Sequence, residues 1–294
     1  MTAATASRPR LYLTLGRVSN VPTVWTNTLA GITLGGGPGG AGSALRLATS
    51  LSLFYVGGMF LNDAFDRGTD ARERPERPIP SGSISAIEVF GVGFALLVAG
   101  LALLAVNAAL AGGMGTGAVG SGVVLGALVV LYDAWHKQNP WSPVVMGACR
   151  SAVYVTAGLG AGGTLGWPLV LGALVSGAYV VGLTFVARQE NRQSFRAGLT
   201  LLLLASPVAV AAIGPSMGLF ACGVLMVFVG WAASTVQSLF APSPIVPRAV
   251  VRLIAGISLV DALLMAAYGA PVLAMLGIAG FGATLALQRW IRGT

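Results

Sequence analysis

Acidic residues are scarce in this chain, and most of them lie in one short segment. Of the nine Asp and Glu residues among 294, five fall between positions 63 and 76, in the stretch LNDAFDRGTDARERPERPIPSG. If a helix runs through it, Asn62, Asp66 and Asp70 recur at i, i+4 and i+8 and share one face, and Asp63 lies beside that face. Crowded oxygen ligands suit Mg²⁺, which commonly binds through one or two carboxylates plus substrate phosphates. The spacing predicts a magnesium site formed by these four residues.

Basic residues are interspersed with these acids. Guanidinium groups bind phosphate oxygens well, so they are candidates to hold the phosphates of a metal-bound substrate or to anchor the loop at the membrane surface. The alternative interpretation is a solvated, charge-balanced loop that joins two helices. The scarcity of acids elsewhere in the chain favours a binding site. The basic residues concerned are Arg67, Arg72, Arg74 and Arg77.

The composition identifies the setting of this site. The chain is 55 % hydrophobic and only 9 % charged, with a mean hydropathy of +0.83. Soluble domains carry roughly a quarter charged residues, so this composition excludes a soluble globular enzyme, a disordered chain and a disulfide scaffold. Its 42 glycines suit close helix packing in a bilayer. We therefore expect an all-α, polytopic membrane protein that forms one domain over residues 1–294.

Apolar stretches long enough to span a membrane follow one another along the chain. A spanning helix needs roughly 20 apolar residues, and about nine to ten such spans are expected. The ranges are 18–35, 45–61, 84–106, 110–131, 143–163, 167–187, 197–213, 217–238, 249–268 and 271–288.

The net charge of +8 is distributed in a way that predicts topology and disfavours nucleic acid as a partner. The basic residues occur in small groups between apolar runs, and they do not form one stripe. Nearly all lie in alternate connections, and the other set has only Arg46 at its edge. By the positive-inside rule we expect a multi-pass protein of the cell membrane whose N-terminus and aspartate-rich loop are cytoplasmic. The basic set comprises the N-terminus, 62–83, 132–142, 188–196, 239–248 and the C-terminal RWIRGT.

Three stretches resemble one known family. NDAFDRGTD fits the pattern NDxxDxxxD, and RPIPSG follows it at the expected distance, as in the first aspartate-rich motif of the UbiA superfamily of intramembrane prenyltransferases. RVSNVPTVWTNTLAG is similar to that family's first helix, with Arg17 and Asn20 at the matching positions. YDAWHK, from Tyr132 to Lys137, is similar to the end of its fourth helix.

The resemblance implies a helix bundle around a central cavity that opens sideways to lipid. It also implies an isoprenyl diphosphate held through Mg²⁺ between two aspartate-rich motifs. The chain departs from the second motif, because TFVARQENRQSFR has Glu190 where the family has a DxxxD pattern. The sequence AR-E at this place resembles that of the EboC-like branch of the superfamily. The family usually has nine spans, whereas about ten are expected here.

The resemblance also implies roles for individual residues. For Glu190 the alternative is a helix-end charge paired with a neighbouring arginine, for Arg17 an interfacial anchor, and for Tyr132 an interfacial aromatic. Asp66, Asp70 and Glu190 are the expected catalytic residues. The expected metal ligands are Asn62, Asp63, Asp66, Asp70 and Glu190, and the expected substrate contacts are Arg17, Asn20, Arg77, Tyr132, Lys137, Arg188 and Arg192.

Several other residues receive simpler interpretations. Asp133 is expected to be solvated at a helix end, and His136, the chain's one histidine, to be interfacial. A single histidine excludes a histidine-based metal cluster and a Ser-His-Asp triad. The two cysteines, Cys149 and Cys222, lie in apolar stretches and are expected to be small buried side chains.

Asp261 differs, because it falls near the middle of an expected span. We expect either a structural hydrogen bond within the bundle or a role with substrate or protons. Arg252 would be its partner only if the backbone bends, because nine residues of straight helix separate the two by about 13 Å.

The function that fits best is Mg²⁺-dependent transfer of an isoprenyl group from an allylic diphosphate to a small or membrane-associated acceptor, with release of pyrophosphate. The altered second motif keeps a second hypothesis open, a membrane transporter or lipid-binding protein that has lost catalysis. A lipid hydrolase that uses water as the acceptor is a third. A coupled transporter should carry several mid-membrane charges, and only Asp261 and Arg150 qualify. Prenyl chain length and acceptor identity stay open.

Overall fold

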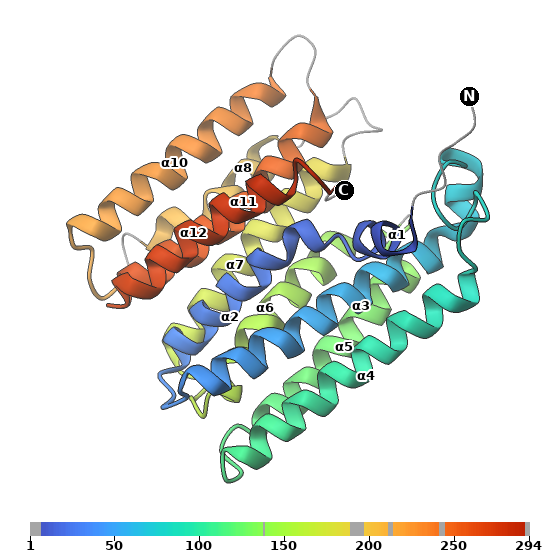
Figure 1. The fold of residues 1–294 in the computed structure, drawn as a ribbon. Helices are drawn as coiled ribbons and strands as arrows, with labels where there is room; N and C mark the ends of the chain where they lie inside the picture. The colour runs from blue at the N-terminus through green and yellow to red at the C-terminus, as the bar shows by residue number, and fades with distance from the viewer. Residues whose placement is uncertain (1–6, 138, 189–196, 211–213, 241–244, 292–294) are drawn as a thin grey trace.

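The computed structural model describes residues 7–137, 139–188, 197–210, 214–240 and 245–291, and in these ranges the regular structure is entirely helical (Figure 1). The helices are α1 (Arg8–Leu15), η1 (Val18–Asn20), α2 (Val21–Gly35), α3 (Ala41–Glu73), α4 (Ala86–Leu110), α5 (Gly117–Trp135), α6 (Ser142–Gly160), α7 (Trp167–Ala187), α8 (Ala197–Leu204), η3 (Ser206–Ala209), α10 (Leu219–Leu239), α11 (Val246–Ala267) and α12 (Pro271–Leu287).

A helix occupies each of the ten apolar ranges expected from the sequence. The all-helical membrane architecture is confirmed, and the count of nine to ten spans is approximate. α8 has only eight residues, a length of about 12 Å that is too short to cross a bilayer core. Six of the described helices are long and apolar enough to span a membrane: α3, α4, α5, α7, α10 and α11.

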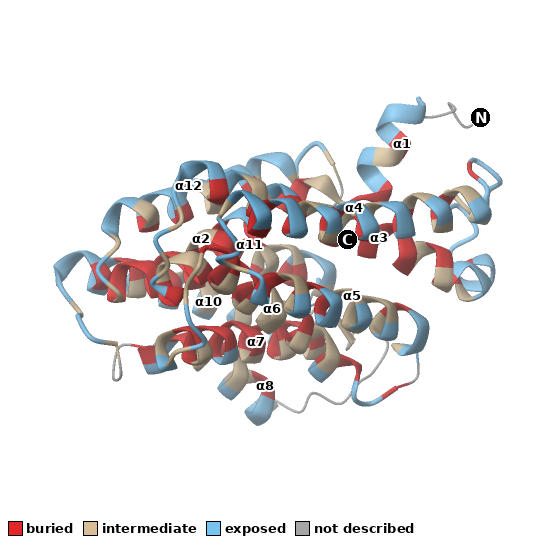
Figure 2. Ribbon diagram, turned by 90° about the horizontal axis from the view of Figure 1, so that it is seen from below, coloured by how far each residue is buried: buried red, intermediate tan, exposed pale blue. Residues whose placement is uncertain are grey.

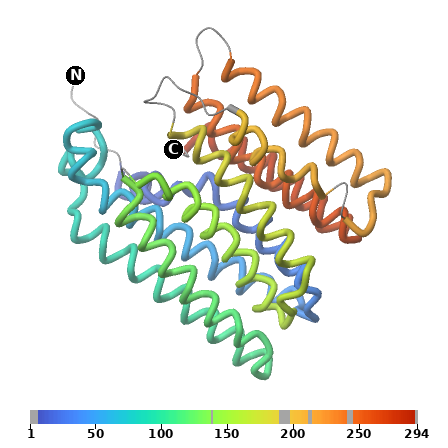
Figure 3. Tube along the Cα trace, turned by 180° about the vertical axis from the view of Figure 1, so that it is seen from behind, coloured from blue at the N-terminus to red at the C-terminus, as the bar shows by residue number. Residues whose placement is uncertain are grey.

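The helices run roughly alongside one another and form two outer groups around a middle layer. α3, α4 and α5 lie on one side and α10, α11 and α12 on the other, with α2, α6 and α7 between them (Figures 1 and 3). The early helix α2 packs against the late helices α11 and α12 as well as against α6. The N-terminal segment therefore joins the two halves of the bundle.

Burial follows this layering. α11 and α7 are mostly buried, whereas α4, α5, α10 and α12 carry exposed outer faces (Figure 2). On α10, Leu219 is 93 % exposed and Met226 is 75 % exposed. Such side chains are costly in water but suit lipid, so the outer surface is that of an integral membrane protein. Cys149 is buried as expected, but the expectation for Cys222 is wrong, because this apolar stretch faces outward and leaves Cys222 exposed.

α3 is the element that carries the acidic segment. Its 33 residues give a length of about 50 Å, well beyond the roughly 30 Å of a bilayer core. The expectation that the second spanning helix continues through the acids is confirmed, since α3 ends only at Glu73. One rigid helix therefore connects the apolar bundle to the charged end.

Glycines let α2 and α6 approach closely. A methyl group on Gly31 would lie 2.6 Å from the backbone oxygen of Tyr154, and one on Gly35 would lie 2.8 Å from the Cα of Gly158. Both distances are too short for a real Cβ, so this contact requires glycine.

We predict that Gly31→Ala destabilises the bundle by about 1–3 kcal/mol, because the added methyl meets backbone that cannot move aside. The melting temperature in detergent should fall by about 3–10 °C. Gly120→Ala is the matched control, since Gly120 lies within α5 with open space beside it. Equal melting temperatures for the two variants would contradict the close contact.

Candidate active site

Two acids of α3, Asp66 and Asp70, are buried at the end of the bundle, and Asp63 is partly buried, whereas Glu73 at the helix end is exposed. Asn62, Asp66 and Asp70, spaced by four residues, are only 8 %, 6 % and 3 % exposed. Asp63, beside them, keeps a side-chain exposure of 13 %. Because buried carboxylates are costly unless compensated, each should lie beside a donor or a cation.

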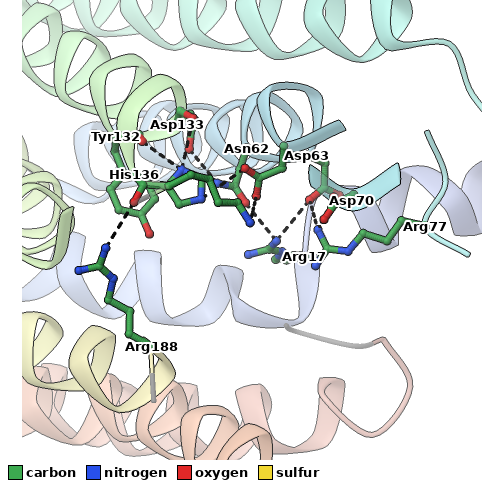
Figure 4. Close-up of polar contacts among 11 residues, drawn as sticks. Arg17, Asn62, Asp63, Asp70, Arg77, Tyr132, Asp133, His136 and Arg188 are labelled. Atoms are coloured by element: carbon green, nitrogen blue, oxygen red, sulfur yellow. Dashed lines mark hydrogen bonds and ion pairs between the residues drawn. The ribbon is translucent and has the colours of Figure 1, made fainter. Parts of the chain in front are cut away.

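Two arginines bridge part of this group (Figure 4). The Arg17 Nη2 atom lies 3.3 Å from Asn62 Oδ1 and 3.4 Å from Asp63 Oδ1. The Arg77 Nη1 atom lies 2.9 Å from Asp70 Oδ2 and 3.4 Å from Asp63 Oδ1. Arg77 reaches back from the loop after α3, and Arg17 comes from the turn between α1 and η1. The structure thus brings together five of the residues singled out in the sequence.

The C-terminal end of α5 supplies the partners of Asp66. The His136 Nε2 and Lys137 Nζ atoms each lie 3.4 Å from an Asp66 carboxylate oxygen. The expectation of a merely interfacial His136 is wrong, because its side chain is only 14 % exposed and contacts the acid group. Tyr132 stacks on His136 with ring centroids 4.9 Å apart. The two rings lie next to one another at the edge of the site.

Asp133 joins the same group, and the expectation that it is solvated is wrong. It is 4 % exposed, and its Oδ1 atom accepts a hydrogen bond of 3.2 Å from Asn62 Nδ2. Its Oδ2 atom is buried and has no hydrogen-bond partner among the described residues. The sequence does contain a signal for this placement, since Asp133, His136 and Lys137 are spaced i, i+3 and i+4 and face one side of a helix end.

Arg17 is held in an unusual backbone conformation. Its φ of 44° is the only positive value at a non-glycine position in the part of the chain that the structure describes. Left-handed backbone costs an ordinary residue roughly 1–2 kcal/mol, and such strain concentrates at functional sites. Burial alone would lower the pKa of Arg17, but nearby negative charges, Asp63 foremost, raise this pKa above its ordinary value. Arg17 therefore stays charged beside the acids.

The carboxylate and amide oxygens of this group are suited to a hard divalent cation. In this conformation basic side chains contact the carboxylates instead. Among the described residues no group of three or more His, Cys, Asp or Glu side chains is arranged to hold a metal ion. In the pairs described above, Asp63, Asp66 and Asp70 each lie against an Arg, His or Lys side chain. Asp133 Oδ2 is a buried oxygen for which the described residues supply no donor, and such a group can be satisfied by a bound cation or ligand. Carboxylate and amide oxygens are also the ligands that Mg²⁺ prefers.

The other expected substrate contacts fall around this group. Asn20 is buried, and its Oδ1 atom accepts a 3.0 Å hydrogen bond from Gln288 near the end of α12. Arg188, at the end of α7, donates to backbone oxygens of His136 and Asn139 (Figure 4). Glu190 and Arg192 lie outside the described residues. Their roles stay predictions.

A cavity of about 100 Å³ adjoins the acid group on the side of the bundle interior. Its wall shares Asp133 and Tyr132 with the charged end. Most of the remaining wall is apolar, with Tyr55 and Arg150 as the other polar side chains. The lining residues are Val24, Leu51, Phe54, Tyr55, Gly58, Met59, Leu125, Val129, Tyr132, Asp133, Met146, Cys149, Arg150 and Val153.

Asp261 is fully buried and hydrogen-bonded within the bundle, as one of the two interpretations expected. Its carboxylate accepts hydrogen bonds from Thr26, Asn27 and Tyr154 on two other helices. Arg252 is not its partner in the structure, because that guanidinium donates to Thr235 and lies over the Trp231 ring.

The fold and the site together define an intramembrane helix bundle with a charged end beside an apolar cavity. The model of the UbiA prenyltransferase family matches residues 23–254. The chain therefore belongs to the UbiA prenyltransferase family, and the resemblance noted in the sequence is confirmed.

Sequence relatives include two proteins named digeranylgeranylglyceryl phosphate synthase. The one from Methanoregula boonei is 32 % identical over 143 residues, which cover 49 % of this chain and 46 % of the relative. The one from Ignicoccus hospitalis is 37 % identical over 91 residues, which cover 31 % and 29 %. The chain thus spans less than half the length of the curated relatives it matches.

Solved structures share the whole fold at low identity. One, from work on digeranylgeranylglyceryl phosphate synthase in membranes, aligns with a TM-score of 0.62 and 18 % identity over 91 % of this chain and all of that one. A UbiA homologue from Archaeoglobus fulgidus bound to GPP and Mg²⁺ aligns with a TM-score of 0.52 and 15 % identity over 94 % and 99 %. These matches establish the architecture.

We predict that Arg17→Gly is more stable than Arg17→Ala by about 1 kcal/mol. Both variants lose the guanidinium, but only glycine adopts the positive φ without strain. The melting temperatures in detergent should differ by about 2–4 °C. A higher melting temperature for the alanine variant would contradict the left-handed backbone at this position.

Proposed function

We propose that the chain transfers an isoprenyl group from an allylic diphosphate to an acceptor, with Mg²⁺ as cofactor. The observation that carries this proposal is the interleaving of carboxylates and guanidiniums beside an apolar cavity whose wall includes Asp133 and Tyr132. A diphosphate with a metal ion presents both charges, and an isoprenyl tail suits apolar walls.

The residues divide by charge. Asn62, Asp66 and Asp70 are the proposed metal ligands, with Asp63 supporting them. When bound, Mg²⁺ would offset the negative charge of the departing pyrophosphate. Arg17 and Arg77, which now contact the acids, are placed to bind the phosphate oxygens instead once a cation occupies the carboxylates. Lys137 adds a third cation on the Asp66 side.

The rest of the site would shelter the reaction. In the transfer, the C–O bond of the allylic diphosphate breaks, its electron pair leaves with pyrophosphate, and an acceptor carbon or oxygen bonds to the allylic carbon and loses a proton. The apolar walls, Leu51 and Val129 among them, exclude water that would otherwise capture the allylic cation. The aromatic ring of Tyr132 lies where the charged end meets the cavity.

The position of Asp261 disfavours the transporter alternative. Its carboxylate receives hydrogen bonds from three side chains and is fully buried. A proton- or ion-coupled transporter needs mid-membrane acids that exchange their partners during the cycle. The charge distribution supports the orientation proposed from sequence, with the acid group on the cytoplasmic side of the cell membrane.

We predict that Asp66→Asn and Asp70→Asn each reduce Mg²⁺-dependent pyrophosphate release on the order of 100-fold, because each removes a carboxylate that would hold the Mg²⁺ ion that offsets the charge of the departing pyrophosphate. The assay uses protein in lipid nanodiscs with radiolabelled allylic diphosphates and candidate acceptors. Glu73→Gln is the matched control, since this exposed acid ends the same helix three residues after Asp70, and it should keep the parent rate.

Two results would oppose the proposal in different ways. Full activity in both Asp variants would remove the metal assignment. Conversion of the label to free prenyl alcohol, whatever the acceptor, would identify a hydrolase. Transfer of the label to an acceptor supports the transferase.

We predict that Glu190→Gln raises the Mg²⁺ concentration needed for half-maximal activity, because Glu190 is the acid that stands where the family has its second motif. Gln189→Glu, which adds a carboxylate next to Glu190, serves as the comparison with the opposite change of charge. A Mg²⁺ dependence unchanged by Glu190→Gln would leave Glu190 as a helix-end charge.

A further inference from the structure

Arg150 is a charged side chain inside the apolar part of the bundle. It lies on α6, eight residues after Ser142, or about 12 Å along the helix. Its side chain forms part of the cavity wall beside Val153 and Met146. A guanidinium at this depth is costly unless it meets acceptors or an anion, so its presence marks a function.

The structure holds Arg150 in place through a neutral group. Arg150 donates through Nη1 to Asn27 Oδ1, and the Asn27 amide nitrogen lies 2.7 Å from each oxygen of Asp261. Asp261 in turn accepts from Thr26 and Tyr154. The amide of Asn27 therefore stands between the cation and the buried acid, and the structure contains no ion pair between Arg150 and any described carboxylate.

This arrangement leaves donors for a ligand. A guanidinium has five N–H groups, and the one hydrogen bond found for Arg150 among the described side chains goes to Asn27. Tyr55 lies between the two ends of the site, because it also lines the cavity and its hydroxyl is 3.5 Å from the Arg17 carbonyl oxygen. The cation of Arg150 is thus separate from the arginines that face the α3 acids.

We propose that Arg150 recognises an anionic oxygen group, a carboxylate or a phosphate, on the acceptor. The ligand is an amphiphile whose apolar body fits the cavity and whose anion meets the guanidinium. This inference rests on the proposed function. The acceptor's anion would lie at Arg150 and the donor's diphosphate at Arg17 and Arg77. Two fixed charges would then orient the two substrates toward one another across the wall that contains Asp133.

The test measures equilibrium binding to the full chain in nanodiscs of neutral phosphatidylcholine, without any prenyl donor. Two probe pairs differ in charge at nearly constant shape: benzoate against benzamide, and oleoyl lysophosphatidate against monooleoylglycerol. The first pair represents a soluble source of the anion and the second a lipid headgroup. The variants are Arg150→Gln, Arg150→Lys and, as the matched control at the other end of the site, Arg77→Gln.

We expect the parent to bind the anionic member of at least one pair about 10- to 100-fold more tightly than the neutral member, the range of one or two charge-assisted hydrogen bonds. Arg150→Gln should abolish this preference. Arg150→Lys should keep part of it, because lysine retains the charge but lacks the planar fork. Arg77→Gln should keep all of it while weakening inorganic pyrophosphate binding, which Arg150→Gln leaves unchanged.

Equal affinity of the parent for the charged and neutral members of both pairs would overturn the proposal, as would an intact preference in Arg150→Gln. If Arg150→Gln does not fold, the test relies on Arg150→Lys. The proposal would then be overturned if Arg150→Lys and Arg77→Gln both prefer the anionic probe as strongly as the parent does. Anion binding at Arg150 without pyrophosphate release from any allylic diphosphate would instead refute the proposed transferase and leave this site standing.

Discussion

A charge inside a lipid-embedded bundle must be compensated within the bundle, and the rest of this structure depends on that constraint. Asp66 and Asp70 near the end of α3 are buried and Asp63 is partly buried, and Arg17, Arg77 and the end of α5 converge on these three acids. The length of α3 places the acids at the end of the bundle. The left-handed backbone at Arg17 is the local cost of bringing its guanidinium to the same place.

The buried acids of this bundle are compensated in two ways, one suited to ligand binding and the other to holding the helices together. At the end of α3 the partners of the carboxylates are cationic side chains. A ligand that carries a metal ion and phosphates can replace each of these pairs, because the metal ion can bind the carboxylate and a phosphate can bind the cationic side chain. At Asp261 the partners are neutral hydroxyl and amide donors on neighbouring helices, which no such ligand displaces. The first arrangement is suited to turnover. The second fixes α2, α6 and α11 against one another and positions Arg150.

The features of this arrangement that depend on residues close together in the sequence could be predicted from the sequence. Hydropathy alone predicts the helices, and the four-residue spacing predicts that Asn62, Asp66 and Asp70 act together. The spacing of Asp133 and His136 places them on one face of a helix end, but the contact of that face with the α3 acids depends on how α5 packs against α3, which no local pattern contains. Cys222 shows a second limit, because an apolar residue in a membrane protein faces either lipid or core, and hydropathy is the same for both.

The central claim is that acids and bases at the end of α3 exchange partners for a metal ion and a diphosphate. The most direct measurement is a titration of inorganic pyrophosphate binding to the protein in nanodiscs across a range of Mg²⁺ concentrations. Because coupling between two ligands is reciprocal, each should strengthen the binding of the other. The account predicts that saturating Mg²⁺ increases pyrophosphate affinity by about 10-fold or more, while Mg²⁺ alone binds weakly. Pyrophosphate affinity that does not change with Mg²⁺ would contradict it.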